Sequence, residues 1–214
     1  ITIVMSIILC LSRAAWLNLI LSIILIFGKK SIKWIAPFLI IFSSIIFLIL
    51  IPIFGENVQL LLREIIPVSI WSNFSHSTYT EISRIELWQN AFEIISKNPI
   101  IGIGTDSFSA LLEAKTGYWR AHPHNLPLEL MVSYGIPGSL FILVPFLIIL
   151  KDSINKVFIQ KHLNFKENIF DKSWVISLLL LAIGHLVDIQ YFDGRISIAG
   201  WILLAGAKNI MEKG

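Results

Sequence analysis

Cysteine and charge are both scarce in this chain, and each scarcity excludes a class of protein. Cys10 is the only cysteine and lies within an apolar run, so neither a disulfide framework nor a cysteine-based metal site is available. Charged residues make up 14% of the sequence and hydrophobic residues 56%, whereas soluble domains have about 25% and about 45–50%. The composition therefore indicates a membrane protein.

Signals for nucleic-acid binding and for secretion are also missing. A net charge of +3 could favour nucleic acid, but the lysines lie in short loops between apolar runs, where membrane orientation explains them. The chain begins at Ile1, within hydrophobic sequence, and has no charged region or cleavage pattern of a signal peptide. We expect a piece of a longer membrane protein that has membrane lipids, and no nucleic acid, as partners.

What the sequence has in their place is a series of apolar runs. A bilayer core requires about 20 apolar residues as a helix. The predicted fold is all-α: one polytopic membrane helix bundle over residues 1–214, with a truncated N-terminus and a large extracytoplasmic segment over 55–136. The run at 137–150 is short, but it gains length if 126–134 is a helix that continues across a break at 135–138. The predicted spans cover residues 1–11, 14–27, 34–54, 137–150, 174–192 and 196–210.

The basic residues divide by type across this topology. Ten of the twelve lysines fall in two loops and the tail, which marks that side as cytoplasmic. All five arginines fall on the other side. Because guanidinium grips phosphate oxygens bidentately and ammonium does not, this favours phosphate or carboxylate recognition outside, although five residues are also few enough for chance. The arginines are Arg13, Arg63, Arg84, Arg120 and Arg195.

Arg13 stands in the middle of the first apolar stretch, which is too long for one ordinary span. Either two helices meet at Arg13 on the outer face, or one long helix carries it buried. An arginine at mid-bilayer costs roughly 2.5–3.5 kcal/mol on insertion scales. In both interpretations Arg13 faces something polar.

The extracytoplasmic segment contains a predicted amphipathic helix. Thr78 and Glu81 have the spacing of a capping box, and Pro99 ends the helix. Apolar residues between them recur at steps of three or four, so we expect about four turns lying along the membrane surface or packed on the spans. Arg84 shares a face with Trp88, as a surface charge beside a core aromatic. The predicted apolar face consists of Ile82, Ile85, Trp88, Phe92 and Ile95.

Three short motifs then follow in order. Residues 98–108 read NPIIGIGTDSF, residues 122–130 read HPHNLPLEL, and residues 134–138 read YGIPG. Each is weak alone. Together with Arg13 between apolar runs and Arg84 before Leu87-Trp88, the ordered set resembles the shared domain of bacterial O-antigen ligases and O-antigen polymerases, over about residues 4–140.

The resemblance implies a metal-independent glycosyltransferase of the multi-spanning GT-C type, with no cofactor. Such enzymes transfer a glycan from undecaprenyl pyrophosphate to a hydroxyl of a glycan or lipid-core acceptor, as ligase or polymerase in O-antigen and lipopolysaccharide assembly. They work on the periplasmic side of the inner membrane. By matching positions, His124 would be the catalytic loop histidine, with Arg13 and Arg84 as pyrophosphate-contacting arginines. Asn125 and Glu129 match the pattern that follows the histidine.

Elementary chemistry agrees with these roles. A sugar hydroxyl is a poor nucleophile, and neutral imidazole is a base in the right range, so His124 is the predicted general base. A leaving pyrophosphate requires metal or fixed donors, and the outer segment has no Asp-x-Asp pair, which leaves arginines. Asn125 is a favourable N-cap for a helix from Leu126, whose first amides would point toward the same anion.

Further candidates rest on position alone. Arg120 and His122 join the predicted substrate-binding residues, and for His122 a role in supporting the residues that touch substrate and a place on the surface are equally open. His122 and His124 could instead ligate zinc, but two ligands do not make a site. His185 and Asp188 are predicted to share a helix face in the fifth span, either as functional groups or as an interhelical polar contact.

The competing function is transport of a small anion such as bicarbonate, with arginines and intramembrane polar groups lining a path. Against it, the sequence has no internal repeat and no pair of interrupted helices in corresponding positions, which are the usual indications of a transporter site.

Overall fold

The computed structural model is mainly helical in the residues that it describes, which are 6, 12–51, 55–66, 68, 83–159 and 165–212. No strand occurs in these ranges, so the predicted all-α class is confirmed. The chain divides into two compact units, residues 1–81 and 82–214, and each is described by itself.

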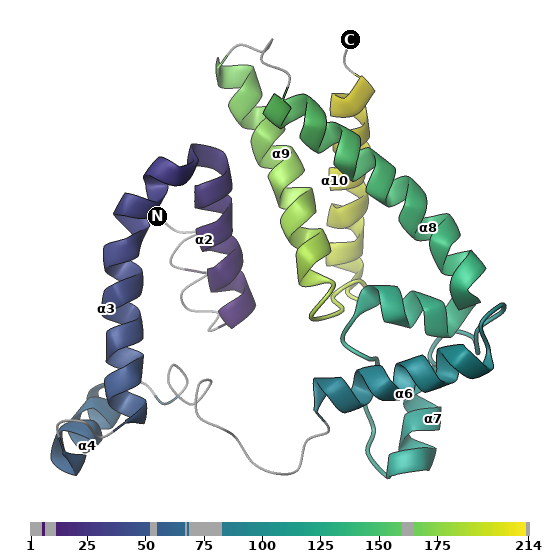
Figure 1. Cartoon of the computed structure of the whole chain (residues 1–214), viewed down its shortest axis with the longest axis horizontal. Coiled ribbons are helices and arrows are strands. Elements are labelled where there is room, and N and C mark those ends of the chain that lie inside the picture. The colour runs from purple at the N-terminus through teal and green to yellow at the C-terminus, as the bar shows by residue number, and fades with distance from the viewer. Residues whose placement is uncertain are drawn as a thin grey trace. The chain divides into compact units, whose positions relative to one another are not determined.

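The N-terminal unit is a helical hairpin followed by a short helix (Figure 1). Its elements are α2 (Arg13–Phe27), the 3-10 helix η1 (Lys29–Ser31), α3 (Ile32–Leu50) and α4 (Glu56–Ile65). Gly28 supplies a positive φ of 77° at the turn of the hairpin. The rings of Trp16 and Phe42 meet edge to face at 5.6 Å, so they help to hold α2 against α3.

α2 begins at Arg13 because Ser12 is its N-cap. The Ala15 N–H donates to Ser12 Oγ at 3.3 Å and satisfies one free amide of the first turn. Because the backbone of Ser12 is extended, the helix starts at this point, and one continuous helix through Arg13 is excluded. The first predicted span, residues 1–11, lies outside the described residues except for Ser6.

α4 caps the carbonyl end of α3. Gln59 Nε2 donates to the Ile49 carbonyl at 2.9 Å, and Arg63 Nε donates to the same oxygen at 3.3 Å. Carbonyls in the last turn of a helix have no partner within it. Arg63 therefore has a structural use within this unit.

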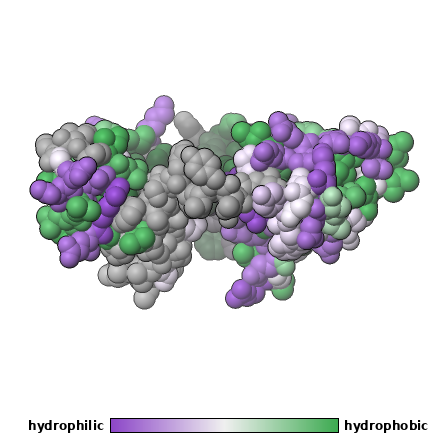
Figure 2. Space-filling view, turned by 90° about the horizontal axis from the view of Figure 1, so that it is seen from below, coloured by the Kyte–Doolittle hydropathy of each residue, from purple (hydrophilic) through white to green (hydrophobic). Residues whose placement is uncertain are grey.

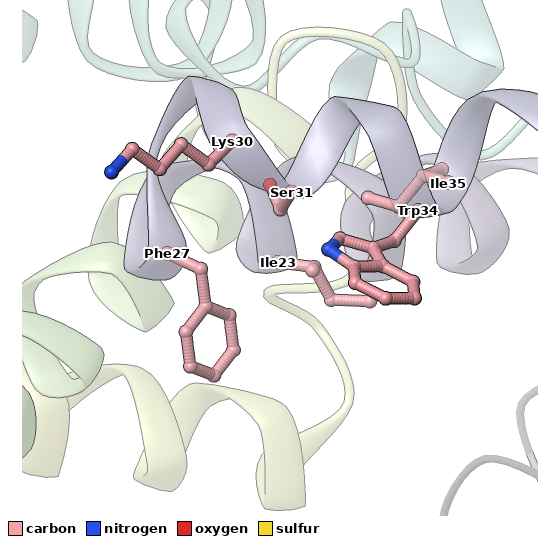
Figure 3. Close-up of a pocket in the computed structure, with 6 residues that line it drawn as sticks. All are labelled: Ile23, Phe27, Lys30, Ser31, Trp34 and Ile35. Atoms are coloured by element: carbon pink, nitrogen blue, oxygen red, sulfur yellow. The ribbon is translucent and has the colours of Figure 1, made fainter.

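A pocket of about 340 Å³ lies between α2 and α3. Figure 3 shows that side chains from both helices and from η1 line it, and that none of them is a predicted site residue. It includes Lys30, one of the lysines predicted to face the cytoplasm. The pocket is therefore not the predicted site. Its lining residues are Ile23, Phe27, Lys30, Ser31, Trp34 and Ile35.

The C-terminal unit contains five helices in its described part: α6 (Arg84–Lys97), α7 (Ser107–Thr116), α8 (Leu126–Ile159), α9 (Phe165–Gly184) and α10 (Gly194–Glu212). In Figure 1 α9 and α10 run side by side, the second half of α8 leans across them, and α6 lies under the first half of α8. One core joins α6, α7 and the start of α8. It consists of Leu87, Ala91, Ile95, Phe108, Leu112, Leu128 and Val132.

α6 differs from the predicted amphipathic helix in its start and in its buried face. Its capping box is Ser83 with Glu86, and the box predicted at Thr78 and Glu81 lies outside the described residues. The helix buries Leu87, Ala91 and Ile95, whereas Ile85 and Phe92 are 67% and 58% exposed. The prediction was wrong for Ile85 and Phe92, whereas Ile95 is buried and Trp88 packs against the same core. A period of three or four fits both faces, and only packing distinguishes them.

Ion pairs on the surface join α6 to α7. Glu93 binds Lys97 at 2.8 Å within α6 and also binds Lys115 of α7, while Lys115 Nζ donates to Asn90 at 2.9 Å. Lys115, and after it Lys97, lowers the pKa of Glu93 to about 2. Because these groups are exposed, the ion pairs add little to stability, and their main effect is to align α6 with α7.

α8 is broken at Gly135, as predicted for residues 135–138. The φ of 70° and ψ of 177° of Gly135 are not helical. Pro137 has no N–H, so the carbonyl of Ser133 loses its helical donor. The Gly104 N–H takes that place at 3.1 Å. The loop after α6 thus completes the hydrogen bonding of a helix that the sequence interrupts.

The same loop satisfies two further backbone groups at the break. The Ile103 N–H donates to the Val132 carbonyl, and the Ile136 N–H donates to the Pro99 carbonyl, both at 2.8 Å. Buried backbone groups without partners would each cost free energy comparable to a lost hydrogen bond. Residues 98–104, which form much of the first motif, therefore act as a backbone clamp on α8.

Two glycines make this approach possible. A Cβ on Gly102 would lie 2.5 Å from the Val132 carbonyl oxygen, and a Cβ on Gly135 would lie 2.2 Å from the Ile100 carbonyl oxygen. Both have positive φ, 72° and 70°. Space and backbone conformation both require glycine here.

Two helices in the described ranges are long and apolar enough to cross a membrane, Lys29–Leu50 and Leu126–Ile159. Trp34 and Phe141 on them are 80% and 84% exposed, which fits contact with lipid. α8 and α9 extend into the segment between the predicted spans 137–150 and 174–192, so both helices are longer there than predicted. Seen from its α6 and α7 side, the C-terminal unit instead presents hydrophilic residues among hydrophobic ones (Figure 2).

Candidate functional site

His124 lies in the loop between α7 and α8 and has a left-handed backbone, with φ of 54°. The preceding residue, Pro123, is fully buried, and its carbonyl accepts the indole N–H of Trp88 at 3.0 Å. Trp88 thus ties α6 to this loop. A non-glycine residue at positive φ costs of order 1–3 kcal/mol and is frequent at functional sites.

The turn after α9 runs alongside this loop and is joined to it by three interactions. The Leu126 N–H donates to the His185 carbonyl at 2.8 Å, and Asn125 Nδ2 donates to the Leu186 carbonyl at 2.9 Å. His124 Nδ1 lies 2.8 Å from Asp188 Oδ1. The second motif and the turn at 185–188 therefore form one site.

The partner of His124 sets its tautomer. Asp188 Oδ1 also accepts the Ile189 N–H at 2.9 Å, so the carboxylate acts as an acceptor in both contacts. The proton shared with His124 then belongs on Nδ1. In the neutral ring Nε2 of His124 then carries the lone pair that a general base requires.

His122 packs between His124 and the turn before α10. Its ring lies 4.5 Å from the ring of His124, edge to face, and 6.0 Å from the ring of Phe192, stacked at 22°. Its Nδ1 accepts the backbone N–H of His124 at 3.3 Å. Partial burial, and secondarily the neighbouring His124, lowers the pKa of His122, which favours the neutral ring.

Asn125 is the predicted N-cap of α8, and this prediction is confirmed. Its Oδ1 accepts the Leu128 N–H at 3.0 Å, and α8 begins at Leu126. One amide of the first turn is thereby satisfied. The cap also fixes His124 at the positive end of the helix dipole.

Glu129 lies in the first turn of α8 and is 4% exposed. One carboxyl oxygen accepts from Ser133 Oγ at 3.1 Å. Among buried side-chain atoms in the described part of the chain, the other oxygen, Oε2, lacks a hydrogen-bond partner. A buried oxygen without a hydrogen-bond partner lowers the stability of the fold, and a functional role is one explanation for its presence.

Glu129→Gln separates these explanations. The neutral amide is cheaper to bury than a carboxylate, so we expect an unfolding temperature equal to or above that of the wild type. If Glu129 contacts substrate, glycan transfer falls roughly tenfold or more. Exposed Glu113→Gln on α7 is the matched control. Full transfer by the Glu129 variant, with folding intact, would remove Glu129 from the site.

The arginines have different surroundings. Arg84 is exposed in the first turn of α6 and shares a face of the helix with Trp88, whose indole binds the His124 loop. Arg120 is half-buried in the segment before His122. Arg195 is bound by Asp193 at 2.8 Å. Arg13 begins α2 in the N-terminal unit, and its place beside His124 stays a prediction.

Three of the groups just described could also hold a metal ion. The ligand atoms of His122, His124 and Asp188 lie within 4.8 Å of one another. Asp188 thus supplies the third donor that the two histidines lacked in the sequence, and three protein ligands are usual for catalytic zinc. A shared ion would replace the proton between His124 and Asp188. The same residues are therefore either a base and its partner or a metal triad.

The interpretation of His185 and Asp188 from the sequence was wrong in its geometry. α9 ends at Gly184, so the two residues lie in a turn and not on one helix face. His185 is buried, and its Nδ1 donates to the Leu181 carbonyl at 2.7 Å. Gly184 favours this helix end because glycine is a poor helix former. Sequence reasoning kept Asp188 open as a functional group, because it is an ionisable residue in an apolar run, but did not join it to His124, and it missed Phe192.

Comparison with known proteins identifies the family. A family model described as O-antigen ligase matches residues 1–143, about two thirds of the 214 residues. The match includes Arg13, Arg84 and the three motifs. No curated protein and no solved structure matches the chain. The chain belongs to the O-antigen ligase family, and the resemblance seen in the motifs is confirmed.

Membership of this family indicates the general function of the chain. It makes the chain a membrane-embedded, glycosyltransferase-like protein with a role in polysaccharide assembly of the O-antigen ligase or polymerase type. The anion-transport hypothesis receives no support from it.

Proposed function

We propose that this protein transfers a glycan from an undecaprenyl-pyrophosphate carrier to an acceptor hydroxyl, with His124 as general base and no metal. The observation that carries the proposal is the 2.8 Å contact between His124 Nδ1 and Asp188. It leaves Nε2 as a lone-pair acceptor in a half-buried loop of a chain from the O-antigen ligase family.

The reaction combines three events. The acceptor hydroxyl attacks the anomeric carbon, its proton passes to Nε2 of His124, and the bond from that carbon to the pyrophosphate oxygen breaks. Direct attack inverts the anomeric configuration. Asp188 stabilises the imidazolium that forms, because a carboxylate beside Nδ1 offsets the new positive charge.

The leaving pyrophosphate gains negative charge and needs fixed donors. We assign this task to Arg84, Arg120 and, from the N-terminal unit, Arg13. Their guanidinium groups match phosphate oxygens in pairs. The first amides of α8 do not serve this anion as the sequence predicted, because the Leu126 N–H binds the His185 carbonyl, Pro127 has no N–H and the Leu128 N–H binds Asn125. The dipole of α8 still adds partial positive charge at the end that carries His124. The site would face the periplasm, at the outer side of the inner membrane.

The direct test is glycan transfer by the purified full-length protein in liposomes, with lipid-linked donor and acceptor supplied. Wild-type protein should attach glycan to the acceptor and release undecaprenyl pyrophosphate. In a deletion strain, loss of all attached polymer indicates a ligase, and retention of one repeat indicates a polymerase. Uptake of labelled bicarbonate by the same liposomes, without transfer, would refute the proposal.

Arg84→Lys tests the arginine assignment. Lysine keeps the charge but loses the paired donors, and hydrogen bonds to charged groups contribute about 1.5–3 kcal/mol. We therefore expect kcat/KM to fall roughly 10- to 100-fold. Arg195→Lys is the matched control, because Asp193 already binds that side chain. Equal activity of the two variants would exclude a paired phosphate contact at Arg84.

A further inference from the structure

We propose that His122 is a positioning residue that holds the backbone of His124 in its left-handed conformation and so aims the base. This inference rests on the proposed function, since it concerns the same histidine. It gives His122 a specific supporting role, which the sequence left open beside substrate contact and a surface position.

The backbone of His124 needs an external support. Its φ of 54° is unfavourable for a residue with a side chain, and the residue before it, Pro123, cannot donate a backbone hydrogen bond. The Trp88 indole holds the Pro123 carbonyl at 3.0 Å. The next backbone group, the N–H of His124, is held by Nδ1 of His122 at 3.3 Å.

This contact has the geometry of an Asx turn. In such turns a short acceptor side chain binds the N–H two residues later, and asparagine and aspartate are the usual residues. His122 does the same with Nδ1. The contact requires an unprotonated Nδ1, and a ring that is half-buried next to a second imidazole favours that state.

The ring of His122 is itself held from the other side. Phe192 stacks on it at 6.0 Å and comes from the turn between α9 and α10, which also carries Asp188. Phe192 is 56% exposed, so its burial adds little to the fold. Asp188 therefore orients the imidazole of His124 through Nδ1, while Phe192 and His122 orient its backbone.

The test compares His122→Ala with His122→Asn in the full-length protein. Alanine removes the acceptor, and asparagine replaces it with one suited to an Asx turn. We expect His122→Ala to lower kcat roughly 10- to 100-fold, as small displacements of a catalytic group do, with both KM values within about twofold. His122→Asn should recover most of the loss. Wild-type kcat in His122→Ala, or no recovery in His122→Asn, overturns the proposal.

Two more measurements keep the result interpretable. Phe192→Ala, at an exposed position, should lower kcat roughly threefold to tenfold without a change in KM. If size-exclusion chromatography shows that His122→Ala does not fold, Phe192→Ala is the deciding variant. A raised acceptor or donor KM with normal kcat in either variant would mean substrate contact and would refute positioning. His124→Ala in the same assay separates the hypotheses: if it is active, the proposed function fails, and if it alone is inactive, only the role of His122 fails.

Discussion

His124→Ala is expected to abolish glycan transfer while the lipid-linked donor still binds. General base catalysis contributes about 10²–10⁴ in rate, and alanine leaves no group to accept the proton of the acceptor hydroxyl. Gel analysis of attached glycan, with the lipid-linked donor measured in parallel, checks this result. The loop should keep its fold, because the hydrogen bonds from Trp88 and Asn125 do not use the imidazole. A variant with wild-type product would reject His124 as the base.

Asp188→Asn should come close to the same loss. An amide can turn its NH2 group toward Nδ1, which moves the ring proton to Nε2 and removes the base. It also lacks the charge that stabilises the imidazolium, so a loss of roughly 10²–10⁴ is expected. Asp193→Asn is the matched control: Asp193 lies five residues on and binds Arg195 instead of a histidine.

The double variant decides whether the two residues work as a pair. Groups that act as a unit show strongly non-additive losses, so the double variant should be no slower than His124→Ala alone. Losses that multiply would mean that Asp188 acts independently. Chelator treatment should leave the wild-type rate unchanged. Inactivation that zinc reverses would instead assign His122, His124 and Asp188 to a metal.

The local part of this site could be predicted from the sequence. Asn125 as N-cap and the break in the helix at 135–138 follow from residue types whose effects act within a few positions. The start of α2 after its N-cap Ser12 is likewise a local effect of residue type. These features depend on backbone groups that the residue itself supplies, removes or binds.

The contacts between distant segments could not be predicted in this way. His124 and Asp188 are 64 positions apart, and their contact depends on where α9 ends. A helix that continued to residue 192 also fits the apolar run. Gly184 disfavours it only weakly, and the turn at 185–188 binds the start of α8 in its place. The buried face of α6 has a similar cause, because Leu87, Ala91 and Ile95 share a core with residues of α7 and α8 that the period of α6 does not reveal.

The largest effect on stability is expected from alanine at either glycine of the backbone clamp. Gly135 has φ of 70° and ψ of 177°, a region that essentially only glycine occupies, at a cost of about 1–3 kcal/mol for other residues. Its new Cβ would also lie 2.2 Å from the Ile100 carbonyl, and overpacking adds about 1–3 kcal/mol. In Gly102→Ala the new Cβ would lie 2.5 Å from the Val132 carbonyl oxygen, so we expect a similar loss of stability.

Gly117→Ala is the control that isolates the contact from the backbone strain. Gly117 has φ of 74° at the end of α7, and a Cβ there would meet nothing within 4 Å. Only the conformational cost of about 1–2 kcal/mol remains. Loss of helical circular dichroism on heating in detergent should therefore rank the variants as wild type, Gly117→Ala, then the two clamp variants far below. Because the clamp holds the first half of α8 on α6, the clamp variants should also lose transfer activity at temperatures where Gly117→Ala keeps it. Equal unfolding temperatures for the three variants would mean that residues 98–104 do not support the broken helix that carries Asn125 and fixes His124.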